Sequence, residues 1–146
     1  MTQVTLRAAT TDDADFLYHL HRAAMQAYVV HTWGRWDEAW QWQRFRQHFD
    51  PSACQIVVLH GQDIGAIRVA RRAADIDLSS IELLPAYQGQ GIGTQLITTL
   101  IAEAHQAGIP LTLQVLKVNP ARRLYERLGF STCGETATHY LMRATP

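Results

Sequence analysis

The stretch from Leu83 to Leu96, LLPAYQGQGIGTQL, constrains the fold of this chain more than any other. An apolar, strand-like run ends at Pro85, and Gly89, Gly91 and Gly93 follow at alternate positions before a helical pattern. At the start of a helix, unpaired backbone N–H groups and the helix dipole both favour an anion. Glycines there allow unusual φ angles and let a phosphate approach the backbone. The stretch therefore predicts a phosphate-binding turn between a strand and a helix, the alternative being a tight connection with glycines chosen only for conformation.

Two common phosphate-binding motifs do not fit this turn. A Walker loop needs a lysine after its last glycine, whereas Thr94 and Gln95 follow Gly93. A dinucleotide-binding fingerprint reads G-x-G-x-x-G in the first strand–helix unit. Here the pattern is G-x-G-x-G and lies in the middle of the chain. Both types of nucleotide site are thereby excluded.

Hydrophobic periodicity predicts one α/β domain over residues 1–146, with the order β-α-α-β-β-β-α-β-α-β-β. Hairpins make antiparallel strand pairs, and the strand–helix–strand unit across the glycine turn makes a parallel pair, so the sheet is expected to be mixed. Strands are expected over 4–8, 55–60, 64–70, 76–84 and 111–118, with two more between 130 and 143 on either side of a turn near Gly134. Helices are expected within 10–29, 35–49, 92–108 and 119–129, and the candidates for the buried side of the second helix are Trp36, Trp40, Phe45 and Phe49.

The amino-acid composition limits the kinds of binding partner that we expect for this chain. Thirteen basic and 13 acidic residues cancel, which argues against nucleic acid and anionic membranes. Cys54 and Cys133 have no CxxC spacing, so we expect two reduced, buried thiols and no metal site. The N-terminus lacks a signal-peptide pattern, and no apolar run is long enough to span a bilayer. The expected location is the cytoplasm.

Two segments together resemble a known family. Gln88-Gly89-Gln90-Gly91-Ile92-Gly93 resembles the Q/R-x-x-G-x-G/A signature of the GNAT superfamily of acyl-CoA-dependent N-acetyltransferases. Downstream, LQVLKVNPARRLYERLGF, residues 113–130, resembles the strand-Asn-helix-Tyr-Gly-Phe segment of the same family. The resemblance implies a GNAT-like fold, with a mixed sheet of about seven strands flanked by four helices. It also implies acetyl-CoA as co-substrate.

The resemblance further implies where acetyl-CoA binds. The pyrophosphate lies on the turn amides, and the pantetheine pairs with the strand before the turn, whose backbone N–H at Leu83 faces the thioester carbonyl. Asn119 caps the following helix as well as contacting the cofactor, whereas Arg122 is either a phosphate ligand or a solvated side chain. The expected cofactor-binding residues are Leu83, Leu84, Gln88, Gly89, Gln90, Gly91, Ile92, Gly93, Thr94, Asn119, Arg122 and Tyr125.

For catalysis, the family pattern assigns Tyr125 the role of acid that protonates the leaving CoA thiolate, although an aromatic there also suits core packing. The base is open. Counting back from Gln88 without gaps, the family's base positions match Asp77 and Ser79, and Ser79 can only orient a water. Glu82 is the other candidate; by strict alternation it faces away from Asp77 unless a bulge turns it.

The acceptor pocket is expected between the first two helices, their connection and the last hairpin. Its candidate residues are Tyr28, His31, Trp33, Trp36, Asp37, Glu38, His139 and Tyr140. We expect acetyl transfer to a primary amine within a ternary complex, with a small molecule favoured over a protein N-terminus or lysine. The absence of Glu at position 79 leaves a second class open, a non-catalytic acyl-CoA sensor or interaction domain. Relatives often dimerise, so a homodimer is an expectation of the resemblance alone.

Overall fold

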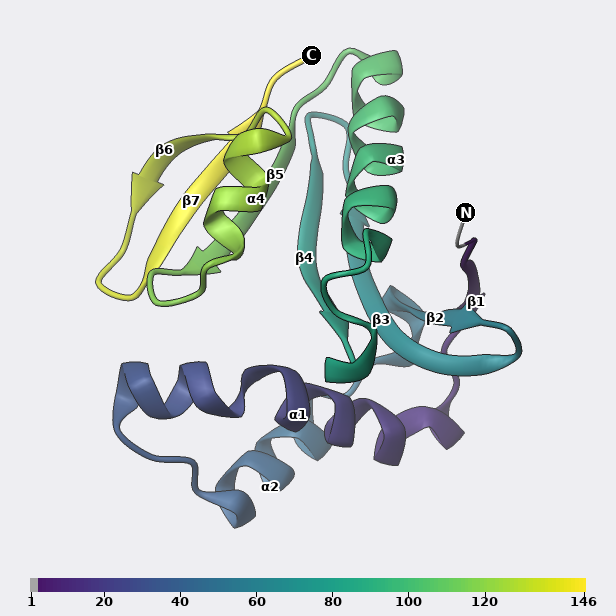
Figure 1. The fold of residues 1–146 in the computed structure, drawn as a ribbon, viewed down its shortest axis with the longest axis vertical. Helices are drawn as coiled ribbons and strands as arrows, with labels where there is room; N and C mark the ends of the chain where they lie inside the picture. Colours follow the sequence, from purple (N-terminus) through teal and green to yellow (C-terminus); the bar gives the residue numbers. More distant parts are fainter. Residues whose placement is uncertain (1–2) are drawn as a thin grey trace.

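The computed structural model describes residues 3–146, which form one seven-stranded mixed sheet flanked by four helices (Figure 1). The helices and strands are β1 (Thr5–Ala8), α1 (Ala14–Trp33), α2 (Glu38–His48), β2 (Cys54–Leu59), β3 (Gln62–Arg71), β4 (Ile76–Leu83), α3 (Ile92–Ala107), β5 (Leu111–Leu116), α4 (Ala121–Arg127), β6 (Ser131–Glu135) and β7 (His139–Ala144). The sheet order is β1-β2-β3-β4-β5-β7-β6. Only β4 and β5 pair in parallel. The fold class expected from the sequence is confirmed.

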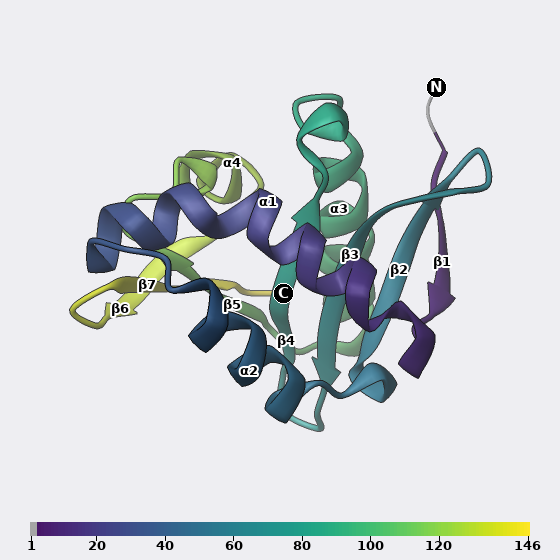
Figure 2. The same cartoon turned by 90° about the horizontal axis from the view of Figure 1, so that it is seen from below.

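The two faces of the sheet carry two separate hydrophobic clusters, with α1 and α2 on one face and α3 and α4 on the other (Figure 2). The larger cluster lies under α3 and α4 and includes Leu96, Leu100 and Tyr125. The smaller lies under α1 and includes Leu17 and Leu20. This division means that each β-strand side chain belongs to one of two distinct environments.

The second helix packs differently from the sequence prediction. Phe45 and Phe49 lie against the smaller cluster as expected. Trp40, expected on the buried side, is 54% exposed, and Trp42 instead packs edge-on against Tyr18 at 4.7 Å between ring centroids. Trp42 and Phe45 are three residues apart and therefore share one helix face, which leaves Trp40 on another.

A β-bulge in β4 decides which side chains face α1. Arg68 of β3 pairs with Ser80, and the next residue, Val69, pairs with Leu78, so Ser79 is the extra residue. An inserted residue reverses the alternation of side chains along a strand. Before the bulge Leu78 packs with the α3 cluster, and after it Ile81 and Leu83 do so. Asp77 and Glu82 consequently lie on the same face of the sheet, towards α1.

Beyond the bulge, β4 and β5 separate. Their parallel pairing covers only Ile76–Leu78 against Leu111–Leu113, although β4 continues to Leu83 and β5 to Leu116. Figure 1 shows the two strands diverging towards the end of the sheet that α1 crosses. The second half of β4 therefore has no strand partner on its β5 side.

Two smaller expectations need correction. Gly134 lies inside β6, and the connection to β7 is at 136–138 instead. Cys54 is buried as expected, but Cys133 is exposed because it lies on the edge strand β6. Within residues 3–146, no helix is both long and apolar enough to cross a bilayer. The same residues contain no cluster of three or more His, Cys, Asp or Glu side chains suited to a metal ion.

Candidate active site

The glycine turn leads directly into the N-terminus of α3. Gly89 and Gly91 have φ angles of 73° and 84°, left-handed conformations that glycine adopts without steric cost. The first helical hydrogen bond runs from the Gln95 N–H to the Gly91 carbonyl at 3.0 Å. The N–H groups of the residues between them precede the helical ladder and have no carbonyl of the preceding turn to bind.

Open space surrounds this helix start. A Cβ atom built at Gly89, Gly91 or Gly93 would meet no protein atom within 4 Å. Gly93 does not have a positive φ angle, so neither crowding by the protein nor backbone conformation requires glycine there. The start of α3 therefore presents unpaired backbone N–H groups in open space, an arrangement that binds phosphate groups. We call it the glycine cradle. A side chain at residue 93 would partly fill this space.

The end of β4 leaves one backbone donor for a ligand. The Leu84 N–H donates to Ile64 of β3 at 2.8 Å, so by antiparallel alternation the Leu83 N–H points the other way, into the gap beside β5. The Leu83 carbonyl accepts from the Gln88 side-chain amide at 2.9 Å, and the Leu84 carbonyl accepts from the Tyr87 N–H at 2.9 Å. The backbone of Leu83 thus offers its N–H where β4 and β5 separate, whereas the N–H of Leu84 is already used within the sheet.

Glycine at residue 65 allows β3 to approach this end of β4. A Cβ atom there would lie 2.5 Å from the Glu82 carbonyl oxygen and 2.6 Å from the Leu83 Cδ2 atom. Cβ atoms in proteins essentially never approach other heavy atoms this closely, so any larger residue would displace the strand. Gly65 therefore fixes the position of both Glu82 and Leu83.

Glu82 forms an ion pair with His21 across α1 and β4. The distance from Glu82 Oε2 to His21 Nδ1 is 2.7 Å, and the two side chains are 15% and 37% exposed. Burial lowers the pKa of His21, but the hydrogen bond and the negative charge of Glu82 outweigh it, so the pKa of His21 is raised above 6.5. Glu82 therefore faces a histidine that favours its protonated form.

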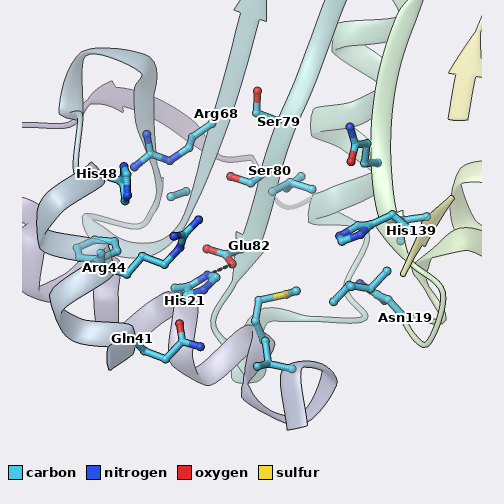
Figure 3. A pocket seen from close by; sticks show the side chains of 18 of the residues that line it. His21, Gln41, Arg44, His48, Arg68, Ser79, Ser80, Glu82, Asn119 and His139 are labelled. Carbon is cyan, nitrogen blue, oxygen red and sulfur yellow. Dashed lines mark hydrogen bonds and ion pairs between the residues drawn. The ribbon is translucent and has the colours of Figure 1, made fainter. Parts of the chain in front are cut away.

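A large cavity connects this pair with Tyr125. It measures about 1110 Å³ and lies between α1, α2 and strands β3 to β5 (Figure 3). Glu82, Tyr125 and Asn119 all line it. Tyr125 packs edge-on against Phe130 at 5.8 Å, and burial raises the pKa of its hydroxyl. One cavity thus contains both a carboxylate and a phenol that stays protonated at neutral pH.

Asn119 and Arg122 have well-defined contacts near the start of α4. The Asn119 side-chain oxygen accepts the Ala121 N–H at 2.9 Å, so it binds the helix start as expected, although Pro120 and not Asn119 directly precedes the first helical residue. The Arg122 guanidinium lies over the ring of Tyr140 at 4.1 Å, and its Nε is 3.2 Å from a carboxylate oxygen of Glu126. Arg122 is therefore held against α4 and β7, and a contact with acetyl-CoA stays a prediction.

The structure does not bring Asp77 to the cavity. Its two carboxylate oxygens accept hydrogen bonds from the hydroxyls of Thr112, at 2.7 Å, and Ser79, at 3.1 Å. Thr112 is its direct partner in the stretch where β4 and β5 still pair. Asp77 therefore links β4 and β5 where the two strands are still paired, whereas Ser79 and Glu82 line the cavity.

The acceptor residues expected from the sequence are placed only in part. Trp33, Asp37 and His139 line the cavity, whereas the other candidates are not among its lining residues. The sequence reasoning missed His21, Arg44 and Arg68, which do line it. Arg68 interrupts an apolar strand, a signal that was available in the sequence. No sequence pattern links His21 with Glu82, because the contact depends on the bulge and on how α1 crosses the sheet.

Comparison with known proteins agrees with this geometry. The sequence profile of the Acetyltransferase (GNAT) family matches residues 14–130. The [ribosomal protein bS18]-alanine N-acetyltransferase of Haemophilus influenzae is 39% identical over 64 residues, which are 43% of this chain and 44% of that relative. The match therefore spans less than half of the relative's length.

Two solved structures share the fold over nearly the whole chain. The PaiA N-acetyltransferase of Thermoplasma acidophilum, in complex with coenzyme A, has a TM-score of 0.78, 17% identity and 99% coverage of both chains. The ribosomal-protein-S18-alanine N-acetyltransferase of Escherichia coli has a TM-score of 0.69 and 23% identity, covering 98% of this chain and 94% of that one. At these identities the two structures support the fold alone.

The profile match covers most of the chain and includes the diverging strands, the glycine turn and Tyr125. The family resemblance expected from the sequence is thereby confirmed. The chain belongs to the GNAT family of acetyltransferases.

Proposed function

We propose that this protein transfers an acetyl group from acetyl-CoA to the primary amine of a small molecule. The observation that carries the proposal is the separation of β4 and β5 beyond the bulge, where the Leu83 N–H points into the gap between the two strands. That gap lies between the glycine cradle at the start of α3 and a cavity lined by Glu82 and Tyr125. An extended pantetheine chain fits such a gap as an added strand, with its pyrophosphate at the helix N-terminus.

The residues of the chain divide the work of a direct transfer. The amine nitrogen attacks the thioester carbon while the Leu83 N–H donates to the carbonyl oxygen, where negative charge develops. Glu82 accepts the proton that the amine must lose, directly or through one water. The carbon–sulfur bond then breaks, and the Tyr125 hydroxyl supplies a proton to the departing thiolate. The products are an N-acetylated amine and free CoA.

Glu82 is the better supported base of the two carboxylates considered. It lines the cavity and is only 15% exposed, whereas Asp77 does not line the cavity and accepts hydrogen bonds from Thr112 and Ser79. The contact with His21, 2.7 Å from Nδ1 to Oε2, holds the Glu82 carboxylate at the wall of the cavity. The bulge at Ser79 therefore contributes to the proposed catalysis, because it turns Glu82 towards the acceptor side of the cavity.

A second candidate acceptor is the N-terminal amine of a protein. The Haemophilus influenzae relative described above is named for acetylation of the alanine of ribosomal protein bS18, which supports this candidate. An N-terminal amine and a free amine require the same chemistry at Glu82 and Tyr125. They differ in whether the cavity receives an extended chain or a single molecule, and activity on matched substrates separates them.

The test combines binding with turnover. Calorimetric titration with acetyl-CoA, with NADH and ATP as controls, should show binding of acetyl-CoA alone. Thiol release measured over a panel of small amines and short peptides should then increase with the right acceptor. Tight acetyl-CoA binding without amine-dependent release over the whole panel would favour the non-catalytic sensor. An absence of acetyl-CoA binding would overturn the proposal entirely.

A further inference from the structure

The acceptor side of the cavity has an excess of unpaired positive charge. Three arginines line it, Arg35, Arg44 and Arg68, against two carboxylates, Asp37 and Glu82. Glu82 is already paired with His21, and an Asp37 oxygen accepts the Trp40 N–H at 3.1 Å. Across residues 3–146, none of these three arginines forms an ion pair with a carboxylate.

Two of these cations lie together beside the proposed base. Arg68 pairs with Ser80 in the sheet, and Glu82 pairs with Ala66, so Arg68 and Glu82 are one strand repeat apart, about 7 Å along the strands. Figure 3 shows Arg68, Arg44 and His48 gathered on one side of the Glu82–His21 pair. A ligand with its amine at Glu82 thus meets the guanidinium groups within the length of a small molecule.

Both guanidinium groups are held in place without being neutralised. An Arg68 Nη1 donates to the backbone carbonyl of Asp50 at 3.1 Å, which leaves its other N–H donors for a ligand. The Arg44 guanidinium lies over the ring of Trp40 at 5.4 Å. Neither contact supplies a negative charge. Preorganised guanidinium groups of this kind bind planar carboxylates through paired hydrogen bonds.

We infer that the acceptor is a small amino carboxylate, with its amine at Glu82 and its carboxylate between Arg68 and Arg44. The inference rests on the proposed function, because it names the substrate class of the same site. The carboxylate fixes the orientation of the molecule and points the amine towards the thioester. It also disfavours acceptors in which the carboxylate is missing or masked, since these make no paired hydrogen bonds with the two guanidinium groups.

The test compares each free amino acid with its amide and with a tripeptide that begins with the same residue. Thiol release from acetyl-CoA is measured for all three forms with the wild-type protein and with Arg68→Gln and Arg44→Gln. Arg46→Gln is the matched control, since Arg46 is also on α2 but lies over Trp42 outside the cavity. Arg44 and Arg46 are both exposed, so neither change threatens folding.

We expect the wild type to prefer the free acid over its amide by roughly tenfold or more in kcat/KM. Arg68→Gln and Arg44→Gln should remove most of that preference, mainly through a higher KM for the free acid. Equal turnover of acids, amides and tripeptides would overturn this inference while supporting the proposed function. A loss of rate of the same size on all three forms in both arginine variants would also overturn it. Binding of acetyl-CoA with no turnover of any of the three forms would overturn this inference, whereas the proposed function fails only if the wider panel of small amines and peptides also gives no thiol release.

Discussion

His21 and Glu82 lie 61 positions apart in the sequence, yet His21 Nδ1 and Glu82 Oε2 are 2.7 Å apart. The contact joins α1 to the second half of β4, just beyond the bulge at Ser79. It places a carboxylate at the wall of the cavity that Tyr125 also lines. The pair therefore connects the irregularity of the sheet with the proton transfer that acetylation of an amine requires.

Replacement of the carboxylate tests this role directly. Glu82→Gln keeps the shape of the side chain but removes the group that accepts the amine proton. We expect kcat/KM for the amine to fall about 10²- to 10⁴-fold, with acetyl-CoA affinity unchanged in calorimetry. Glu103→Gln is the matched control, since Glu103 pairs with Arg71 outside the cavity. A Glu82→Gln rate close to that of the wild type would exclude Glu82 as the base.

The charge of His21 links the pair to pH. The pKa of His21 in the folded protein is raised above 6.5, so its stabilising contribution is fully present below that pH and is lost as the pH rises through the raised pKa. His21→Gln should therefore lower the free energy of unfolding more at about pH 5.5 than at about pH 9. Urea denaturation at the two pH values measures the difference, and an equal loss at both would contradict a raised pKa.

The pKa of His21 gives a second, independent test of the ion pair between His21 and Glu82. In Glu82→Gln the carboxylate that raises the pKa of His21 is gone, and burial and the charge of Arg68 remain, both of which lower it. An NMR titration of the imidazole should therefore show a lower pKa in this variant than in the wild type. An unchanged pKa would mean that the ion pair does not form in solution.

Tyr125 should matter for turnover and not for binding. Tyr125→Phe keeps the ring against Phe130 and removes only the hydroxyl. Because a thiolate is a fairly good leaving group, with a thiol pKa near ~8.5, we expect the lower end of general-acid effects, roughly a 10²-fold loss of kcat. Thiol release and calorimetry on one preparation separate the two effects. Tyr28→Phe, on α1 and away from the cavity lining, should show neither loss.

Glycine at residue 93 is expected to serve the ligand. Its φ angle is not positive, and a side chain there would meet no protein atom within 4 Å. Gly93→Val should leave the melting temperature nearly unchanged while weakening acetyl-CoA binding by about tenfold or more, because the side chain blocks the approach of a phosphate to the amides. A binding loss that appears only together with unfolding would refute a ligand-specific role.

Glycine at residue 65, in contrast, is required by the packing of β3 against β4. A methyl group there would overlap the Glu82 carbonyl oxygen, so Gly65→Ala must push the end of β4 away from β3. We expect a loss of about 1–3 kcal/mol in stability, together with slower turnover, since both Glu82 and the Leu83 N–H move. Gly134→Ala is a suitable comparison, because its nearest contact is a flexible Leu141 methyl at 3.0 Å. Wild-type turnover in Gly65→Ala would show that β4 tolerates the shift.

The sequence predicted the local elements of the candidate site far better than the contacts between distant elements. The glycine turn, the Asn119 cap and Tyr125 are local features, because strand, turn and helix are consecutive in the chain. The acceptor side brings together His21, Glu82 and Arg68 from three separate elements. Their meeting depends on the single extra residue at Ser79, which reverses the alternation of β4 and leaves no signal in hydrophobic periodicity. Strict alternation consequently separates Glu82 from Asp77, whereas the folded strand places both on one face.

The most direct test of the central claim is amine-dependent thiol release by the wild-type protein and by Glu82→Gln and Tyr125→Phe, with acetyl-CoA binding measured on the same samples. An acetyltransferase that works through these two groups binds acetyl-CoA in all three forms and releases CoA with an amine acceptor, slowly in both variants. If acetyl-CoA binds equally well but amine-dependent release is absent in the wild type, or is unaffected by both substitutions, the cavity is not the catalytic site described here.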